Sequence, residues 1–106
     1  MIRRADTASE NPGPRAVRVA LAREISGIVS ARGLNQREVA ALLGTTQPKV
    51  SALMALKVEG FSLDRLVMYL NRLGEDIHIV VLPKPPEREH AHTWVINPAS
   101  VARAGG

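Results

Sequence analysis

The chain has 106 residues, of which 45% are hydrophobic, and this length and apolar content suit one globular domain. Its 14 lysines and arginines exceed its 10 acidic residues, so the formal net charge is +4, which suits an anionic partner without identifying one. Cysteine is absent, which excludes disulfide frameworks and thiolate metal sites.

Membrane and enzyme signals are weak in this sequence. No apolar run approaches the roughly 18 residues that span a bilayer, and residues 1–6 lack the apolar core of a secretory signal, so we expect a cytoplasmic protein with no membrane partner. We also expect neither an enzyme nor a cofactor, because there is no cysteine nucleophile and no glycine-rich phosphate loop. His90 and His92 alternate like ligands on a strand, but no third ligand accompanies them, so no metal site is expected.

The first predicted element follows an apolar-poor start. Residues 1–14 end in Asn-Pro-Gly-Pro and are expected to form a flexible tail. Beyond them, apolar side chains recur at helical spacing, at Val17, Leu21, Ile25 and Ile28. This amphipathic helix should end near Gly33, which suits a C-cap.

Two short helices are predicted next, each with its own start signal. Asn35 and Glu38 have the spacing of a capping box for a helix over residues 36–43. Thr46 can cap a second helix over residues 47–56. Both starts are therefore indicated independently of the apolar pattern.

The turn between these two helices also has characteristic residues. Gly44 tolerates the positive φ of a tight turn, and Ala40 is small enough for two helices to cross closely. Their inner faces are apolar, at Val39, Leu43, Val50 and Leu53. Together these features are typical of a helix-turn-helix.

A fourth helix and a strand complete the predicted fold. Ser62 can cap the helix, whose apolar stripe stops at Gly74. The stripe consists of Leu63, Leu66, Val67, Leu70 and Leu73. Residues 76–82 are then β-branched and too short for a stable helix, so they are predicted to form a strand that ends at Pro83.

A lone strand cannot satisfy its own backbone groups, so it needs a partner. The cheapest partner is the same strand of a second copy, which predicts a homodimer interface. Its residues are Ile77, His78, Ile79, Val80, Val81 and Leu82. We expect the first, third and fifth of these to face the helices and the others to lie on the outer side.

The remaining C-terminal residues are expected to form a flexible tail over residues 83–106. As an alternative to the dimer, residues 93–96 could return as a hairpin partner for the strand. Trp94, the single tryptophan, could either dock on a partner or pack back on its own domain.

Several residues also support a family resemblance, which covers roughly residues 17–82. The helix-turn-helix resembles the XRE or Cro/repressor type at residues 34–36 and at Ala40, Gly44, Gln47, Val50 and Ser51. The continuation over residues 61–66, with Leu73-Gly74 and the β-branched segment, is similar to HigA-type antitoxins of type II toxin-antitoxin systems. The resemblance implies a mainly α, lambda-repressor-like domain of four to five helices over residues 15–82, with a C-terminal strand that pairs across a dimer.

Residues 47–56 would form the recognition helix of such a domain. Its first turn would face base edges in the major groove, which amides, hydroxyls, cations and small apolar groups can read. The candidates for this role are Gln47, Lys49, Ser51 and Ala52. The candidates for phosphate contacts, at the helix starts and beside them, are Gln36, Arg37, Thr46 and Lys57. The alternative is that these residues are ordinary solvated surface.

The resemblance implies a homodimeric transcriptional repressor of a near-palindromic double-stranded DNA operator. It also implies an antitoxin that neutralises a HigB/RelE-like mRNA endonuclease toxin. Two alternatives remain open, a solitary phage-type XRE regulator without a toxin, and a protein-interaction module that has lost DNA binding. Steep salt dependence of DNA affinity would separate a DNA reader from the interaction module.

Overall fold

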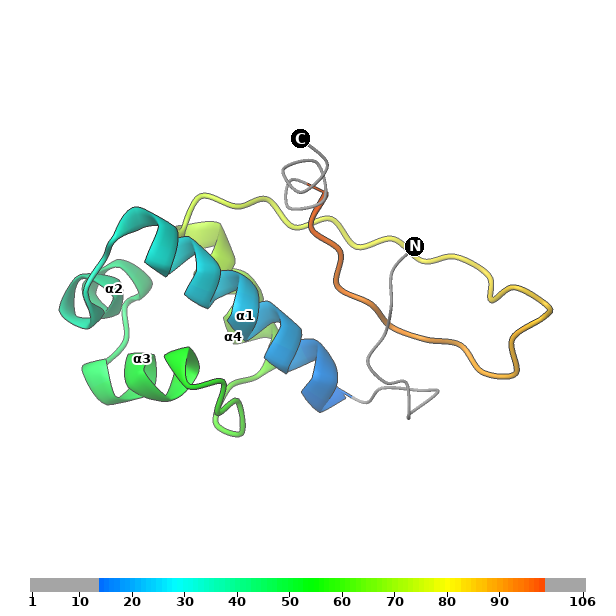
Figure 1. Cartoon of the computed structure of the whole chain (residues 1–106), viewed down its shortest axis with the longest axis horizontal. Helices are drawn as coiled ribbons and strands as arrows, with labels where there is room; N and C mark the ends of the chain where they lie inside the picture. The colour runs from blue at the N-terminus through cyan, green and yellow to red at the C-terminus, as the bar shows by residue number, and fades with distance from the viewer. Residues whose placement is uncertain (1–13, 99–106) are drawn as a thin grey trace.

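The computed structural model of the protein describes residues 14–98, which form four helices and a long extended arm. The helices are α1 (Pro14–Arg32), α2 (Gln36–Leu43), α3 (Gln47–Met54) and α4 (Leu63–Arg72). α1 packs mainly against α4, while α2 and α3 pack on each other at one end of the molecule (Figure 1). None of the helices described is long and apolar enough to cross a membrane. The expected tail over residues 1–14 lies outside the described residues except for Pro14, which begins α1.

The predicted helix starts are confirmed. Asn35 accepts a hydrogen bond from the Glu38 backbone N–H at 2.8 Å, and the Glu38 carboxylate accepts one from the Asn35 N–H at 2.9 Å, so the capping box is complete. The Thr46 hydroxyl caps α3 by accepting from the Lys49 N–H at 3.4 Å. Ser62 caps α4 in the same way.

α3 ends at Met54, two residues before the predicted end. Leu56 takes a φ of +62°, and the Lys57 N–H turns back to the Ala52 carbonyl at 2.9 Å. This is the bonding pattern of a Schellman motif, which usually places glycine at the left-handed position. Leucine has no such freedom, so no residue type at this position marks the end of the helix.

A single core holds the four helices together. The inner faces predicted for α2 and α3 are confirmed, because Val39, Leu43, Val50 and Leu53 are at most 1% exposed. In α4, Tyr69 is fully buried, whereas Leu63 is 46% exposed and belongs to the solvent side of the predicted stripe. The prediction that Leu63 belongs to the buried face of α4 is therefore wrong.

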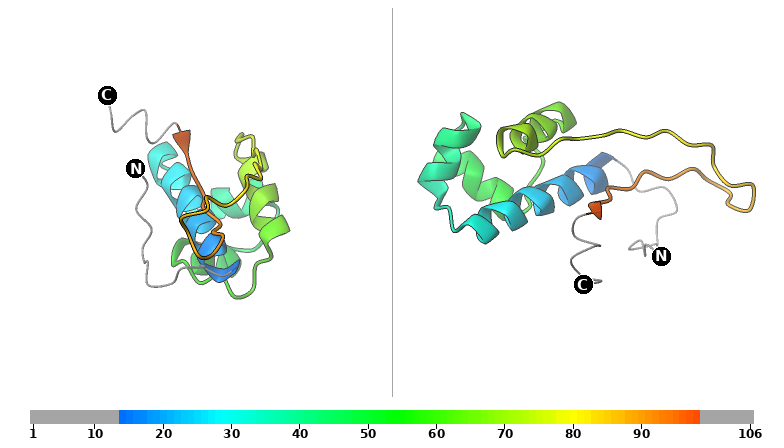
Figure 2. Two further views of the ribbon diagram at one scale, coloured as in Figure 1. Left: turned by 90° about the vertical axis from the view of Figure 1, so that its right-hand side faces the viewer. Right: turned by 90° about the horizontal axis from the view of Figure 1, so that it is seen from above.

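No strand forms among residues 14–98, so the predicted strand over residues 76–82 is not observed in the single chain. Ile77 is half-buried against the core, but Ile79 and Val81 are 81% and 88% exposed. The expectation that these two face the helices is wrong, because the chain leaves the helical body after Ile77 and runs outward (Figures 1 and 2).

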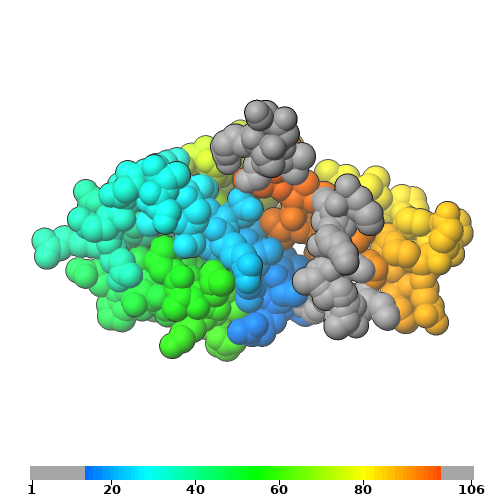
Figure 3. Space-filling model, in the orientation of Figure 1, coloured from blue at the N-terminus to red at the C-terminus, as the bar shows by residue number. Residues whose placement is uncertain are grey.

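Residues 78–94, called the arm from here on, project from the body and return to it. After the arm, Val95 packs against the core and the Asn97 amide donates to the Glu24 carboxylate at 2.6 Å. The arm follows the path of a hairpin, but no strand ladder joins its two legs, so the hairpin alternative is not observed. In the space-filling view the arm lies at the opposite end of the molecule from α2 and α3 (Figure 3).

Trp94 packs within the arm. Its ring lies 5.1 Å from the Arg88 guanidinium and 5.4 Å from the His92 ring, measured between centres. The Arg88 Nη1 atom in turn lies 2.7 Å from the His92 Nδ1 atom, within hydrogen-bond distance. Trp94 nevertheless remains 42% exposed.

The core makes a direct prediction about α2. Leu43→Ala should lower the free energy of unfolding by about 2–5 kcal/mol, because Leu43 is 1% exposed and its removal leaves a cavity. Leu42→Ala is the matched control, since Leu42 is 41% exposed on the same helix and should change stability by only about 0.5 kcal/mol. Urea unfolding followed by circular dichroism measures both, and equal losses would contradict the assigned faces.

Candidate nucleic-acid interface

The α2–α3 turn fixes how α3 is presented. Gly44 has a φ of +72°, and the Thr45 N–H after it bonds to the Ala40 carbonyl at 2.9 Å. The Arg72 guanidinium, from the end of α4, lies against Gly44, and its Nη1 is 2.6 Å from where a Cβ would stand. A side chain at this position would strain the backbone and displace Arg72.

The four candidate base-reading residues all lie on α3. Gln47, Lys49 and Ser51 are exposed, and Ala52 is half-buried. Val50 and Leu53 are 0% exposed and hold the opposite face of the helix in the core. The polar first turn of α3 is thus available to a partner from outside the molecule.

The four candidate phosphate-binding residues surround α3. Gln36 and Arg37 are exposed in the first turn of α2. Thr46 is exposed, but its oxygen already accepts a hydrogen bond as the α3 cap. Lys57 is exposed in the loop directly after α3.

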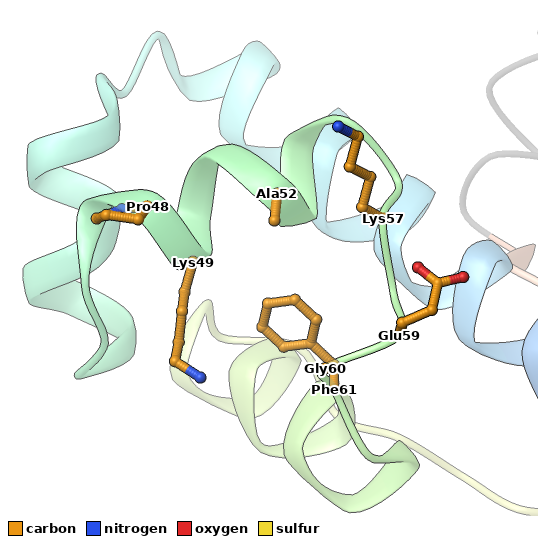
Figure 4. A pocket seen from close by; sticks show the side chains of 7 residues that line it. All are labelled: Pro48, Lys49, Ala52, Lys57, Glu59, Gly60 and Phe61. Carbon is orange, nitrogen blue, oxygen red and sulfur yellow. The ribbon is translucent and has the colours of Figure 1, made fainter.

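An open hollow of about 320 Å³ lies between α3 and the loop that follows it, and we call it the α3 hollow (Figure 4). It is lined by Pro48, Lys49, Ala52, Lys57, Glu59, Gly60 and Phe61. Phe61 is 6% exposed, and the Lys49 Nζ lies 6.0 Å from the centroid of its ring. The hollow therefore unites three predicted residues, Lys49, Ala52 and Lys57, while the other five candidates lie outside its lining.

Glu59 is the acidic member of the hollow, and its charge is compensated from α1. The Arg15 Nε donates to Glu59 Oε2 at 2.8 Å, and the carboxylate is turned toward α1, away from Phe61 (Figure 4). This hydrogen bond is the main cause that lowers the pKa of Glu59, followed by a backbone hydrogen bond and the charges of Arg15 and Arg18. The cations Lys49 and Lys57 thus dominate the electrostatics of the hollow.

Comparisons with known proteins agree with this geometry. A family model described as a helix-turn-helix domain matches residues 4–82. A solved structure described as a "Putative XRE Family Transcriptional Regulator" is 40% identical to this chain, with a TM-score of 0.76 over 79% of this chain and 94% of that one. The chain belongs to the XRE family of helix-turn-helix proteins. No curated protein matches it.

Membership of the XRE family confirms the helix-turn-helix part of the resemblance. The family match ends at residue 82, so it includes the first leg of the arm up to Leu82. Neither match names an antitoxin, and that part of the resemblance stays a prediction.

Sequence reasoning missed several residues of this XRE-family interface. Phe61 had a possible signal, since it is the only phenylalanine and follows the loop glycine Gly60. The contact between Arg15 and Glu59 had none, because the two residues are 44 positions apart. Arg72 was missed for the same reason, since only the packed structure brings it to Gly44.

The ion pair beside the hollow can be tested by titration. Because Arg15 holds the pKa of Glu59 below its ordinary value of 4.5, Arg15→Ala should raise it toward that value. Arg23→Ala, an exposed arginine further along α1, is the control and should leave the Glu59 pKa unchanged. NMR of the side-chain carboxyl carbon measures the pKa, and no change in the first variant would contradict the assigned pairing.

Proposed function

We propose that the protein is a cytoplasmic, sequence-specific DNA-binding repressor that acts as a homodimer. The observation that carries this proposal is α3 itself, whose polar first turn is exposed while its other face is locked in the core of an XRE-family fold. In helix-turn-helix proteins the second helix enters the major groove by its N-terminal residues.

The chemistry of α3 suits base reading. The Gln47 amide can form two hydrogen bonds with N6 and N7 of adenine, and Lys49 can donate to O6 and N7 of guanine. The Ser51 hydroxyl can hydrogen-bond with either of these bases, and Ala52 can make an apolar contact with a thymine methyl group. The phosphate contacts would come from Gln36, Arg37, Thr46 and Lys57, which lie on either side of α3.

Base reading by Gln47 is tested with one exchange. Gln47→Ala should weaken binding to a selected operator by about 1–3 kcal/mol and hardly affect binding to random DNA, since the lost contact is to bases. Fluorescence anisotropy with both DNAs at one salt concentration gives the two values. Equal losses on both DNAs would assign Gln47 to the backbone instead.

The matched variant for that experiment is Lys57→Ala. A phosphate contact carries no sequence information, so this exchange should weaken binding to both DNAs alike. It should also reduce the slope of log affinity against log salt by about one unit. An unchanged slope would remove Lys57 from the contacts, and no DNA binding even at low salt would favour the interaction-module alternative.

The arm supports the proposed homodimer. Its first leg exposes four consecutive aliphatic side chains to between 73% and 88%, at Ile79, Val80, Val81 and Leu82. The same leg has no ladder partner among the described residues. A second copy placed antiparallel by a two-fold axis would pair these backbone groups and cover the side chains. Ile77 and His78 would extend the pairing, and we call residues 77–82 in this arrangement the strand seam.

Three prolines limit the length of this seam. Pro83, Pro85 and Pro86 follow it directly and have no N–H to donate, so the ladder would stop at Leu82. A two-fold dimer could place its two recognition helices about 34–36 Å apart, which matches successive major grooves of a near-palindromic operator.

The seam is tested at its centre. Val80→Pro removes a ladder donor and should give a monomer that keeps its helical circular dichroism, because residue 80 lies outside the helices. Val80→Thr keeps the N–H and the β-branched shape and should remain a dimer. Sedimentation velocity reports the mass of each, and a dimer of unchanged stability in the proline variant would refute the strand seam.

A finer proposal is that the repressor is also the antitoxin of a HigB/RelE-like mRNA endonuclease. It rests on the resemblance to HigA-type antitoxins. It is supported by the arm, which lies at the opposite end of the molecule from α3 (Figure 3) and carries the partly exposed Trp94. A gene for a small basic toxin beside the gene for this chain, whose toxicity this protein suppresses on co-expression, would support it. The absence of such a gene would favour a solitary regulator.

A further inference from the structure

Opposite charges flank the exposed aliphatic residues of the strand seam. Asp76 lies just before the seam and Lys84 lies two residues after it, and both side chains are exposed. The Lys84 ammonium donates to the Arg88 carbonyl at 2.7 Å and to the Pro85 carbonyl at 3.2 Å, which are neutral acceptors. Among residues 14–98, neither Asp76 nor Lys84 forms an ion pair. The described part of the chain therefore leaves both charges without a counterion.

An extended backbone carries Lys84 in line with the seam. Leu82 and Lys84 each precede a proline, which disfavours helical backbone at both residues, and residues 75–85 form no helix or turn. Successive side chains of an extended chain project from opposite faces. One face of this segment therefore has a carboxylate at its start and an ammonium at its end. Its members are Asp76, His78, Val80, Leu82 and Lys84.

A two-fold axis restricts how two such strands can pair. The axis that relates two antiparallel strands stands perpendicular to their sheet, so it keeps every side chain on its own face. Residues that lie opposite each other also share a face. One residue must therefore lie opposite its own copy, and residues equally distant from it on either side lie opposite each other. The candidates for this central residue are Ile79, Val80 and Val81.

The charges favour Val80 as the central residue. With Val80 at the centre, Asp76 lies opposite the partner's Lys84, and the reverse pair forms at the other end of the seam. With Ile79 at the centre, Asp76 would lie opposite Leu82, where a carboxylate loses water and gains no partner.

The register centred on Val81 leaves the charges unpaired as well. It would place Lys84 opposite His78, which offers no negative charge, and Asp76 would lie beyond Lys84 without a cation opposite it. Of the three registers, only the one centred on Val80 pairs both charges.

We propose that the strand seam is centred on Val80, and that Lys84 of each chain forms an ion pair with the partner's Asp76. This inference rests on the proposed homodimer and goes beyond it by naming the contacts that select a second copy of this chain as the partner. Two ion pairs close the two ends of the seam and fix its register. A related chain that carries like charges at the facing positions is rejected, because like charges directly opposite each other destabilise a strand pair.

Charge exchange tests this selection in the full-length chain. Lys84→Glu and Asp76→Lys each place like charges at both ends of their own homodimer, so each should raise the dimer dissociation constant about ten-fold. In a mixture of the two variants, a heterodimer has opposite charges at both ends. Native mass spectrometry should then find about nine-tenths of the dimers as heterodimers, against about one half for random pairing. Random pairing would overturn the inference.

Glu75→Lys is the matched control for Asp76→Lys. It changes the net charge by the same amount one residue earlier, where the side chain of an extended chain projects from the other face. Mixed with Lys84→Glu, it should pair at random. An equal excess of heterodimers with both lysine variants would mean that net charge selects the partner, and would contradict the proposed ion pair.

Single cysteines test the register itself, since the chain has none of its own. In the proposed register the two Val80 Cα atoms lie about 5.5 Å apart, within reach of a disulfide, whereas the two Ile79 Cα atoms lie about 8 Å apart, beyond it. Val80→Cys should therefore cross-link the dimer under mild oxidation, and Ile79→Cys should not. Stronger cross-linking of Ile79→Cys would refute the register.

The proposed homodimer and this inference fail in different ways. An unmodified protein that sediments as a monomer refutes both of them. A dimer that dissociates in Val80→Pro, but whose charge variants pair at random, refutes only the ion pairs.

Discussion

The left-handed turn at Gly44 is the constraint on which the interface depends. α3 has eight residues, and a helix of that length is not stable in water by itself. It exists because the turn directs it back across α2, where Val50 and Leu53 enter the common core. The same packing that stabilises α3 also decides which of its faces is left free, so stability and the candidate reading surface have one origin.

The surfaces of the two proposed interactions are separated in space. α2 and α3 form one end of the helical body, and the arm projects beyond the opposite end (Figures 1 and 3). The proposed operator contacts and the proposed protein contacts therefore do not compete for the same surface. Arg15 connects α1 to the end that is proposed to face DNA, because it neutralises Glu59 beside the cations of the α3 hollow.

The parts of the fold that sequence predicts well are those with local causes. Caps at Asn35, Thr46 and Ser62 depend on residues three positions apart, and the turn depends on one glycine, so each could be read directly. The exposed path of Ile79 and Val81 was missed because alternating apolar residues indicate that a strand needs covering but not which surface covers it. The α3 hollow was missed because Phe61 meets α3 only after the loop between them has folded. The end of α3 was not predicted because Leu56 occupies a left-handed position that usually takes glycine.

If α3 reads bases in the major groove, dimethyl sulfate footprinting on a selected duplex will detect the contacts. The reagent methylates guanine N7 in the major groove and adenine N3 in the minor groove. We expect protection of guanine N7 in two successive major grooves on one face of the duplex, about 10 base pairs apart, with adenine N3 left reactive. Protection of adenine N3 with guanine N7 fully reactive would contradict it.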